Sequence, residues 1–364
     1  MKYISEYRDP VLVKTLLRRI HTQAKNLAEI KLMEVCGTHT MAIAQHGLRV
    51  LLPENVKLIS GPGCPVCVTS NAYLDKAVAL CKRKEVILTT FGDIVRVPGS
   101  STTLEKERAS GADVRIVYST MDALDIAEHN PYKKVVFLGV GFETTAPTVA
   151  AAILMAFNRN LGNFFILCAH KTMPAPMMML ASSGRIKISG FICPAHVSTI
   201  IGTVPYEPLA AKFNKACVVA GFEPLDILEA ISMLLQQIIR RKSRVEIQYS
   251  RVATREGNHR AKELLNEVFN SCDAEWRGIG IIPGSGLKIS NKYAAFDAET
   301  VFSIEAESTK EAKGCICGDI MQGITTPNAC TLYGTVCTPD SPVGACMVSS
   351  EGACAAWYKY NRDI

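Results

Sequence analysis

The segment "IKLMEVCGTHT", from Ile30 to Thr40, joins a short apolar run to a turn that carries a Cys, a Gly, two Thr and a His. The apolar run has the length and composition of a buried β-strand. Reactive side chains directly after a strand can form a functional site. They can also be a buried thiol beside a hydrogen-bonded imidazole, so the rest of the chain has to decide between the two.

Seven further runs of the same kind follow, with helix-like segments between them. They are residues 56–60, 85–90, 114–119, 134–140, 163–169, 188–194 and 216–221. Strands that alternate with helices predict βαβ units and parallel sheets that are buried on both faces. We therefore expect an α/β fold, with two similar four-stranded domains that face each other across a cleft and are joined near Asn130-Pro131.

The loops that follow these runs are rich in Gly, Pro, Thr, His and Cys, whereas the connections at the opposite end are rich in Lys. Ligands of open parallel sheets bind beyond the carboxyl ends of the strands, so we expect the chemistry there. In the second domain, Glu143 of "GFETTAP" and His196 of "CPAHVS" end strands in this way. Each could line the cleft, or could instead cap a helix or order its own loop.

Composition and charge argue against several classes of protein. The 364 residues are 48% hydrophobic, with a net charge of +6 and a mean hydropathy of +0.15. The basic cluster at 240–244 has no interleaved aromatic residues, which argues against nucleic-acid binding. No apolar window approaches the roughly 20 residues of a membrane helix, and the first residues lack the apolar core of a signal peptide. We therefore expect a cytoplasmic protein with no membrane partner.

The last part of the chain is rich in cysteine, Gly and Pro, and we expect it to need a covalent or metal staple. The predicted organisation is a helix in residues 1–30, α/β domains at 31–130 and 131–225, and a third, mixed helical and irregular domain at 226–364. Six cysteines fall within 40 residues of that domain: Cys315, Cys317, Cys330, Cys337, Cys346 and Cys354.

These six cysteines include no C-x₂-C pair, and no histidine accompanies them, which argues against a zinc ribbon. Thiolate ligands alone, in a cytosolic and loop-rich segment, favour an iron–sulfur cluster held by four Cys. Structural zinc and plain buried thiols are the alternatives. The spacing does not select the four ligands, because four can be drawn from six in fifteen ways.

Two other cysteine motifs follow strands. Cys64 and Cys67 in "GPGCPVC" precede a predicted helix, whose dipole favours thiolates, and their spacing allows a disulfide to form and reopen. Half a zinc site or two buried thiols are the alternatives. Cys36 and His39 stand three residues apart and could converge on one metal if the turn enters a helix, since thiolate plus imidazole suits iron, zinc or copper.

Taken together, these motifs resemble the HypD family of hydrogenase maturation proteins over essentially the whole chain. The segments that carry the resemblance are "MEVCGTHT", "GPGCPVCVTS", "GFETTAPT", "GFICPAHVSTIIG" and "PDSPVGACMVSSEGACAAWYKY". HypD proteins help to build the Fe(CN)₂CO unit of NiFe hydrogenases together with the chaperone HypC, while HypE supplies the cyanide groups. The resemblance therefore implies these two partners and a transient role in the pathway of the hydrogenase large subunit.

The resemblance also implies roles for individual cysteines. The family's 4Fe-4S ligand pattern falls on Cys315, Cys330, Cys337 and Cys354, which leaves Cys317 and Cys346 outside the quartet. Its iron-holding cleft cysteine falls on Cys36, with His39 beside it, and its redox dithiol on Cys64 and Cys67. We expect electrons to pass from the cluster to the dithiol and then to the iron ion that becomes the Fe(CN)₂CO precursor.

Two other functions are compatible with the same residues. One is a thiol-disulfide oxidoreductase, in which the iron–sulfur domain reduces the Cys64/Cys67 pair to serve an external disulfide. The other is a non-catalytic scaffold that holds iron while its partners do the chemistry. The resemblance favours hydrogenase maturation, but it does not decide whether the chain is an enzyme or a scaffold.

Overall fold

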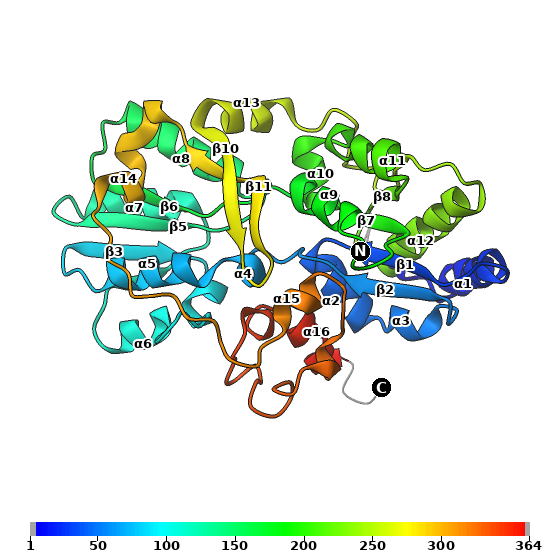
Figure 1. Cartoon of the computed structure of the whole chain (residues 1–364). Helices are drawn as coiled ribbons and strands as arrows, with labels where there is room; N and C mark the ends of the chain where they lie inside the picture. The colour runs from blue at the N-terminus through cyan, green and yellow to red at the C-terminus, as the bar shows by residue number, and fades with distance from the viewer. Residues whose placement is uncertain (1–4, 361–364) are drawn as a thin grey trace.

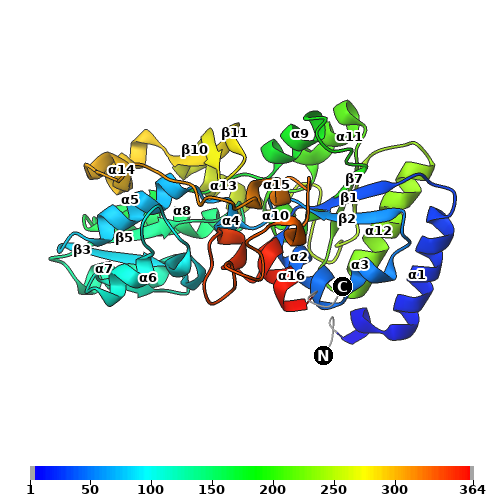
Figure 2. The ribbon, with the colours of Figure 1, turned by 60° about the horizontal axis from the view of Figure 1, so that its bottom comes forward.

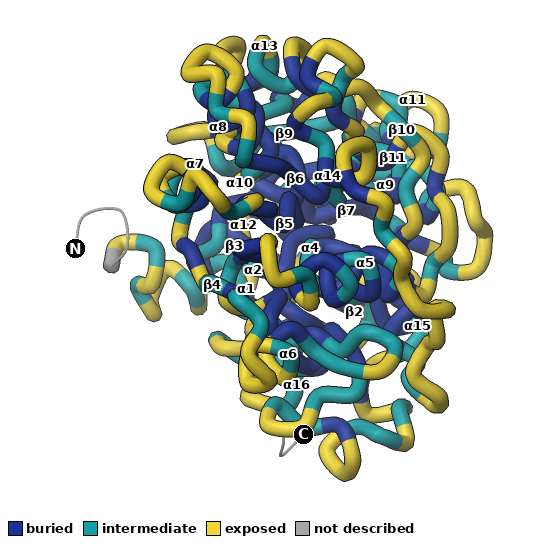
Figure 3. The backbone as a smooth tube through the Cα atoms, turned by 90° about the vertical axis from the view of Figure 1, so that its left-hand side faces the viewer, coloured by how far each residue is buried: buried dark blue, intermediate teal, exposed yellow. Residues whose placement is uncertain are grey.

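The computed structural model describes residues 5–360, which form two α/β units side by side with the C-terminal segment below their junction (Figures 1 and 2). Each unit is built on a parallel sheet whose central strands are buried (Figure 3). Among the described residues, no helix combines the length and the apolar character that crossing a membrane requires.

The five-stranded unit has the strand order β2-β1-β7-β8-β9, all parallel. On one face of this sheet, Ile20 of helix α1 and Ile231 of α12 pack against Leu32 and Val218. The opposite face packs against Met177 of α9. The elements are β1 (Ile30–Glu34), β2 (Val56–Ser60), β7 (Gly190–Pro194), β8 (Ala216–Ala220), β9 (Val245–Ile247), α1 (Pro10–Ala24), α2 (Gly37–Gln45), α9 (Pro174–Ser182), α10 (Ala195–Ile201), α11 (Glu207–Phe213) and α12 (Pro224–Ile239).

The four-stranded unit has the order β4-β3-β5-β6, again all parallel. Alternate residues of β5 face opposite ways: Phe137 packs with helices α7 and α8, and Val136 packs with α5 and α6. This alternation explains why the strands read as unbroken apolar runs. The elements are β3 (Val86–Thr90), β4 (Val114–Ile116), β5 (Lys134–Gly139), β6 (Phe164–Cys168), α5 (Asn71–Cys81), α6 (Leu104–Ala109), α7 (Thr120–His129) and α8 (Ala146–Asn158).

All eight predicted strands are present, but they are divided between the sheets differently from the prediction. β1 and β2 pair with β7 and β8, while β3 to β6 form the other sheet. The predicted boundary at Asn130-Pro131 therefore falls inside the four-stranded unit, and the ranges 31–130 and 131–225 do not match the two sheets. The reason is that a parallel pair is joined by a long crossover, so the order of strands along the chain does not reveal their neighbours.

The predicted third domain at 226–364 is likewise corrected. Most of α12 and all of β9 belong to the five-stranded unit, and α13 (His259–Val268) packs on α8 of the other unit. The hairpin β10 (Phe269–Trp276) and β11 (Gly280–Ile289) lies between the units (Figure 1). Only the stretch from about residue 303 onwards is irregular, and it runs beneath both units.

The remaining elements are short. They are η1 (Ser5–Arg8), α3 (Leu48–Leu51), α4 (Pro65–Val68), η2 (Gly92–Arg96), η3 (Val204–Tyr206), η4 (Asn291–Phe296), α14 (Ala298–Val301), α15 (Cys317–Met321), η5 (Pro327–Ala329), η6 (Ala345–Met347) and α16 (Ala353–Tyr360).

Candidate functional site

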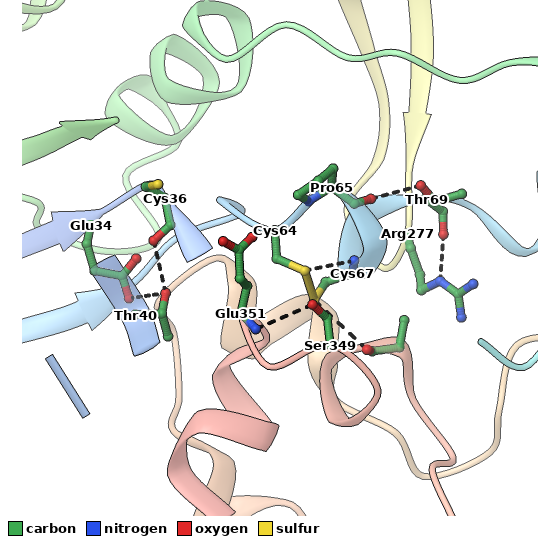
Figure 4. Close-up of a disulfide and its surroundings, with 11 residues drawn as sticks. Glu34, Cys36, Thr40, Cys64, Pro65, Cys67, Thr69, Arg277, Ser349 and Glu351 are labelled. Carbon is green, nitrogen blue, oxygen red and sulfur yellow. Dashed lines mark hydrogen bonds between the residues drawn. A yellow bond between two sulfur atoms is a disulfide. The ribbon is translucent and has the colours of Figure 1, made fainter. Parts of the chain in front are cut away.

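Cys36 lies where β1 ends and α2 begins, as the N-cap residue of that helix (Figure 4). Its backbone is extended, and its side chain makes no capping hydrogen bond. The side chain is only 8% exposed. Burial, reinforced by the negative charge of Glu351, raises the pKa of the Cys36 thiol to about 12. The thiol therefore keeps its proton at neutral pH.

The loop after β2 packs directly on the backbone of Cys36. The carbonyl of Gly63 accepts the N–H of Gly37 at 2.9 Å. A Cβ atom at Gly63 would lie only 2.2 Å from the backbone nitrogen of Cys36, so no larger residue fits there. This close approach places Cys64, the next residue, beside the turn that carries Cys36.

Cys64 and Cys67 form a disulfide, with their Cα atoms 5.3 Å apart (Figure 4). The two sulfurs of this C-x-x-C pair are thus close enough for a disulfide, as their spacing allows. Cys64 is the N-cap of α4 and accepts the N–H of Cys67. The sulfur of Cys67 lies 4.0 Å from the carbonyl oxygen of Ala345, which precedes Cys346. The disulfide thus stands between the Cys36 turn and the cysteine-rich C-terminal segment.

Glu351 comes from that C-terminal segment and contacts the Cys36 turn directly. Its carboxylate accepts the hydroxyl of Thr38 at 2.7 Å. A Cβ atom at Gly37 would lie 2.5 Å from the Cβ of Glu351, so the two segments pack as closely as glycine permits. Analysis of the sequence missed this residue, although "SSEGAC" is part of the segments that resemble the family.

The His39 ring is buried against the loop after β8. Its Nε2 lies 2.9 Å from the carbonyl oxygen of Gly221 and 3.1 Å from that of Ala220, which assigns the proton to Nε2. Nδ1 then carries a free lone pair and has no partner among the described residues. Burial lowers the pKa of His39 to about 4, so the ring is neutral. Metal-binding histidines show this same pattern, with one nitrogen free and the other donating to a carbonyl.

His196, at the start of α10, approaches the same region. Its ring centroid is 4.3 Å from that of Phe222, and the His39 ring is 4.8 Å from Phe222, so both imidazoles contact one phenyl ring. Burial lowers the pKa of His196, and the charge of Glu351 opposes that shift. The structure thus brings both predicted histidines to the Cys36 side of the five-stranded unit.

Glu34, the last residue of β1, lies beneath the site and was missed by the sequence analysis. It is fully buried and accepts the hydroxyl of Thr40 at 2.8 Å. Burial raises its pKa to about 7, against the opposing charge of Arg49, whose Nη2 is 3.9 Å away. The guanidinium of Arg49 also covers the Trp357 ring of α16 at 5.4 Å. A charged residue inside an apolar strand was the signal that could have revealed it.

Glu143, the third predicted cleft residue, lies apart from Cys36. It follows β5, and its Oε1 accepts the N–H of Met173 at 3.0 Å. Its side chain lines a cavity formed by α9, α10, α13 and the hairpin, whose lining residues do not include Cys36. The structure therefore places Glu143 in the lining of a cavity whose lining residues do not include His196, with which the sequence analysis grouped it.

The C-terminal cysteines surround one small cavity, which Leu332, Tyr333 and Met347 also line. Hydrogen bonds from Cys315 and Cys346 lower the pKa of the Cys317 thiol, so these thiols are in mutual contact. The cysteines that line the cavity are Cys315, Cys317, Cys330, Cys337, Cys346 and Cys354.

Within residues 5–360, no group of three His, Cys, Asp or Glu side chains has the geometry to hold a single metal ion. An iron–sulfur cluster is bound differently, because each of its four thiolates binds a different iron and the ligands therefore stand further apart. A cavity walled by sulfur and apolar side chains is compatible with such a cluster. Four thiolates can hold either such a cluster or a single zinc ion.

Comparison with known proteins agrees with these motifs. The model of the HypD family, described as "Hydrogenase formation hypA family", matches residues 11–361. The chain is 50% identical to the hydrogenase maturation factor HypD of Rhizobium leguminosarum bv. viciae, over 100% of this chain and 96% of that protein. It is 45% identical to HypD of Cupriavidus necator, over 100% of this chain and 98% of that protein.

The similarity extends to archaea. A putative hydrogenase expression/formation protein of Methanocaldococcus jannaschii is 45% identical, over 97% of this chain and 98% of that protein. A family match over nearly the whole chain, together with relatives of near-equal length at about half identity, leads to one conclusion: this chain belongs to the HypD family.

Proposed function

We propose that this chain matures NiFe hydrogenases by assembling their Fe(CN)₂CO group in the cytoplasm. In this proposal a HypC-type chaperone shares the iron with Cys36, a HypE-type protein donates cyanide, and the finished group passes to the hydrogenase large subunit. Membership of the HypD family and the names of its relatives support the hydrogenase part of the proposal.

One observation carries the proposal about mechanism: the three cysteine motifs are in continuous contact. The C-terminal segment reaches the Cys64–Cys67 disulfide at Ala345, and the disulfide loop reaches Cys36 through Gly63. The C-terminal segment, 278 residues from Cys67 at this contact, therefore meets the other two motifs in the order that electron delivery to an iron at Cys36 would require.

The residues around Cys36 suit it as the anchor of the iron. Iron that carries cyanide and carbonyl is the substrate here, and a soft thiolate is a suitable ligand for it. When iron displaces the thiol proton, the N–H groups of Thr38 and His39 can stabilise the thiolate. The free Nδ1 of His39 would be a second ligand from this chain, held in orientation by the carbonyl of Gly221.

The other cysteines would supply the electrons. A 4Fe-4S cluster, held by Cys315, Cys330, Cys337 and Cys354, would provide electrons one at a time at low potential. The Cys64–Cys67 disulfide can accept two electrons and two protons to give two thiols, and can return both pairs when it re-forms. In the cytosol, a disulfide is usually transient and catalytic, which fits a redox role for this pair.

Infrared spectroscopy of anaerobically purified protein tests the proposal. Wild type, Cys36→Ala and the matched control Cys81→Ala, which alters a buried thiol of α5, would each be co-expressed with the HypC and HypE partners. We expect cyanide and carbonyl bands in wild type and in the control, and none in Cys36→Ala. Iron and sulfide analysis should give the same cluster content in all three. Bands that persist in Cys36→Ala would exclude Cys36 as the anchor.

The disulfide also favours a second candidate, a thiol-disulfide oxidoreductase that needs no iron at Cys36. Wild type that gives no cyanide or carbonyl bands, but has an intact cluster and a titratable disulfide, would support this function instead. Serine substitutions at Cys64 and Cys67 that leave the bands unchanged would point to a scaffold that holds iron without redox chemistry.

A further inference from the structure

The tip of the β10–β11 hairpin carries a buried arginine, Arg277, which lies against the disulfide loop. Its backbone N–H donates to the carbonyl of Val68 at 3.0 Å, and its Nε donates to the carbonyl of Thr69 at 2.7 Å (Figure 4). Val68 and Thr69 directly follow Cys67 in the sequence. One side of Arg277 is therefore fixed to the segment that carries the disulfide.

The same hairpin tip packs on α15, the helix that begins at Cys317. A Cβ atom at Gly318 would lie only 2.1 Å from the carbonyl oxygen of Gly278, and one at Gly278 would lie 2.7 Å from the Cα of Gly318. Backbone thus meets backbone at the residue after Arg277 and at the residue after Cys317. Arg277 is therefore held between the disulfide loop and the segment whose cysteines line the C-terminal cavity.

Arg277 is a buried cation that lacks a full set of partners. It is only 4% exposed, and its Nη2 has no hydrogen-bond partner among the described residues. Burial lowers the pKa of the guanidinium, and negative charge on four groups opposes that shift: Cys317, Glu311, Cys346 and Cys315. Arginine keeps its proton in proteins, so a positive charge stays beside the cysteine-lined cavity. A buried charge normally has a partner of opposite sign, and a cluster bound by four thiolates would bring negative charge to this place.

We propose that Arg277 raises the reduction potential of the 4Fe-4S cluster in this cavity. The inference rests on the proposed function, in which the C-terminal cysteines hold that cluster. Reduction adds an electron, and a nearby positive charge stabilises the more negative state. Net charge is one of the features that set the potential of a cluster. Because Nη2 is closed off from water, the charge of the guanidinium is weakly screened and acts across the protein interior without contact.

A redox titration of the anaerobically purified, cluster-loaded protein tests this role. Dithionite and mediator dyes would reduce the cluster, and electron paramagnetic resonance would follow its reduced form. Arg277→Met removes the charge and keeps a long unbranched side chain. We expect its equilibrium constant for one-electron reduction to fall at least about tenfold, which lowers the midpoint potential by about 59 mV or more. Arg277→Lys keeps the charge and should stay within about threefold of wild type.

A second neutral variant keeps the test independent of the folding of Arg277→Met. In Arg277→Gln the amide can still donate to the carbonyl of Thr69, and the equilibrium constant should fall to a similar extent. Arg185→Met is the matched control, because Arg185 is a cation beside the same helix but is exposed to water. Its Nη2 is 3.6 Å from Asp319 of α15, and its side chain is 57% exposed. Screening by water should keep this control within about twofold of wild type.

Circular dichroism and the iron and sulfide content would verify that each variant is folded and loaded. Three results would overturn the role of Arg277 and leave the proposed function intact: a potential unchanged in both neutral variants, an equal shift in Arg185→Met, or a shift in Arg277→Lys as large as in Arg277→Met. Wild type without cluster iron and sulfide would instead refute the cluster itself, and the inference with it.

Discussion

Replacing Glu143 by Gln should stabilise the protein at pH 8 and have little effect at low pH. The carboxyl group is buried, which raises its pKa from an ordinary 4.5 to about 7. Below pH 4.5 the group is protonated in both the folded and the unfolded chain, so ionisation costs nothing. Between pH 4.5 and 7 the unfolded chain ionises first, and the folded state loses stability as the pH rises. Above pH 7 this loss reaches about 3 kcal/mol.

A Gln side chain has nearly the same shape and cannot ionise, so the variant should escape this loss. Its oxygen can still accept the N–H of Met173. We expect the free energy of unfolding of Glu143→Gln to exceed that of wild type by about 3 kcal/mol near pH 8 and by less than about 1 kcal/mol near pH 5. Urea unfolding followed by circular dichroism at both pH values measures the difference.

Glu256→Gln is the matched control, because Glu256 is an exposed acid of the same cavity. Its free energy of unfolding should stay within about 0.5 kcal/mol of wild type at both pH values. An advantage of Glu143→Gln that does not grow between pH 5 and pH 8 would refute the reasoning, since the buried carboxyl would then ionise without cost.

Three other predictions concern the site around Cys36. Gly63→Ala should lower the free energy of unfolding by at least about 3 kcal/mol, as thermal unfolding would measure. Gly162→Ala is the control, because its added methyl meets nothing within 4 Å, and it should change that free energy by less than about 1 kcal/mol. Equal effects of the two substitutions would contradict the close packing at Gly63. Reducing the Cys64–Cys67 disulfide should lower the free energy of unfolding by about 2 kcal/mol and make two more thiols available for alkylation. An unchanged free energy of unfolding would argue against the disulfide. Thr38→Val should remove the hydrogen bond to Glu351 and speed backbone hydrogen exchange in the segments around both residues about tenfold, as mass spectrometry would measure. Unchanged exchange would show that these segments stay ordered without this hydrogen bond.

Eight of the strands could be predicted from sequence because each is a short run rich in apolar residues, and most of these residues are buried. β2 (Val56–Ser60) coincides with the predicted run, and β7 (Gly190–Pro194) differs only at its start. The pairing of strands could not be predicted, because parallel strands are joined by crossover connections, and a strand such as β1 can pair with strands that are near or distant along the chain. β1 pairs with β2, the next strand, and also with β7, about 160 residues away.

Only those site residues that belong to recognisable sequence motifs could be predicted. Cys36 and the Cys64–Cys67 pair were found because reactive side chains follow strands, and parallel strands bring those ends to one edge. Glu351 could not be found in this way, since its partner Thr38 is 313 residues distant. Glu143 was also found because it follows a strand, and it lines a cavity between the two units.

The glycines of the site explain how segments so far apart form one centre. At Gly63 a side chain would collide with the backbone of Cys36, and at Gly37 it would collide with Glu351. These two positions let the disulfide loop and the C-terminal segment pack against the Cys36 turn, backbone against backbone. The position of Cys36 is then fixed by main-chain atoms, which move less than side chains. A change in the C-terminal segment would therefore act on the Cys36 turn through the side-chain hydrogen bond between Glu351 and Thr38.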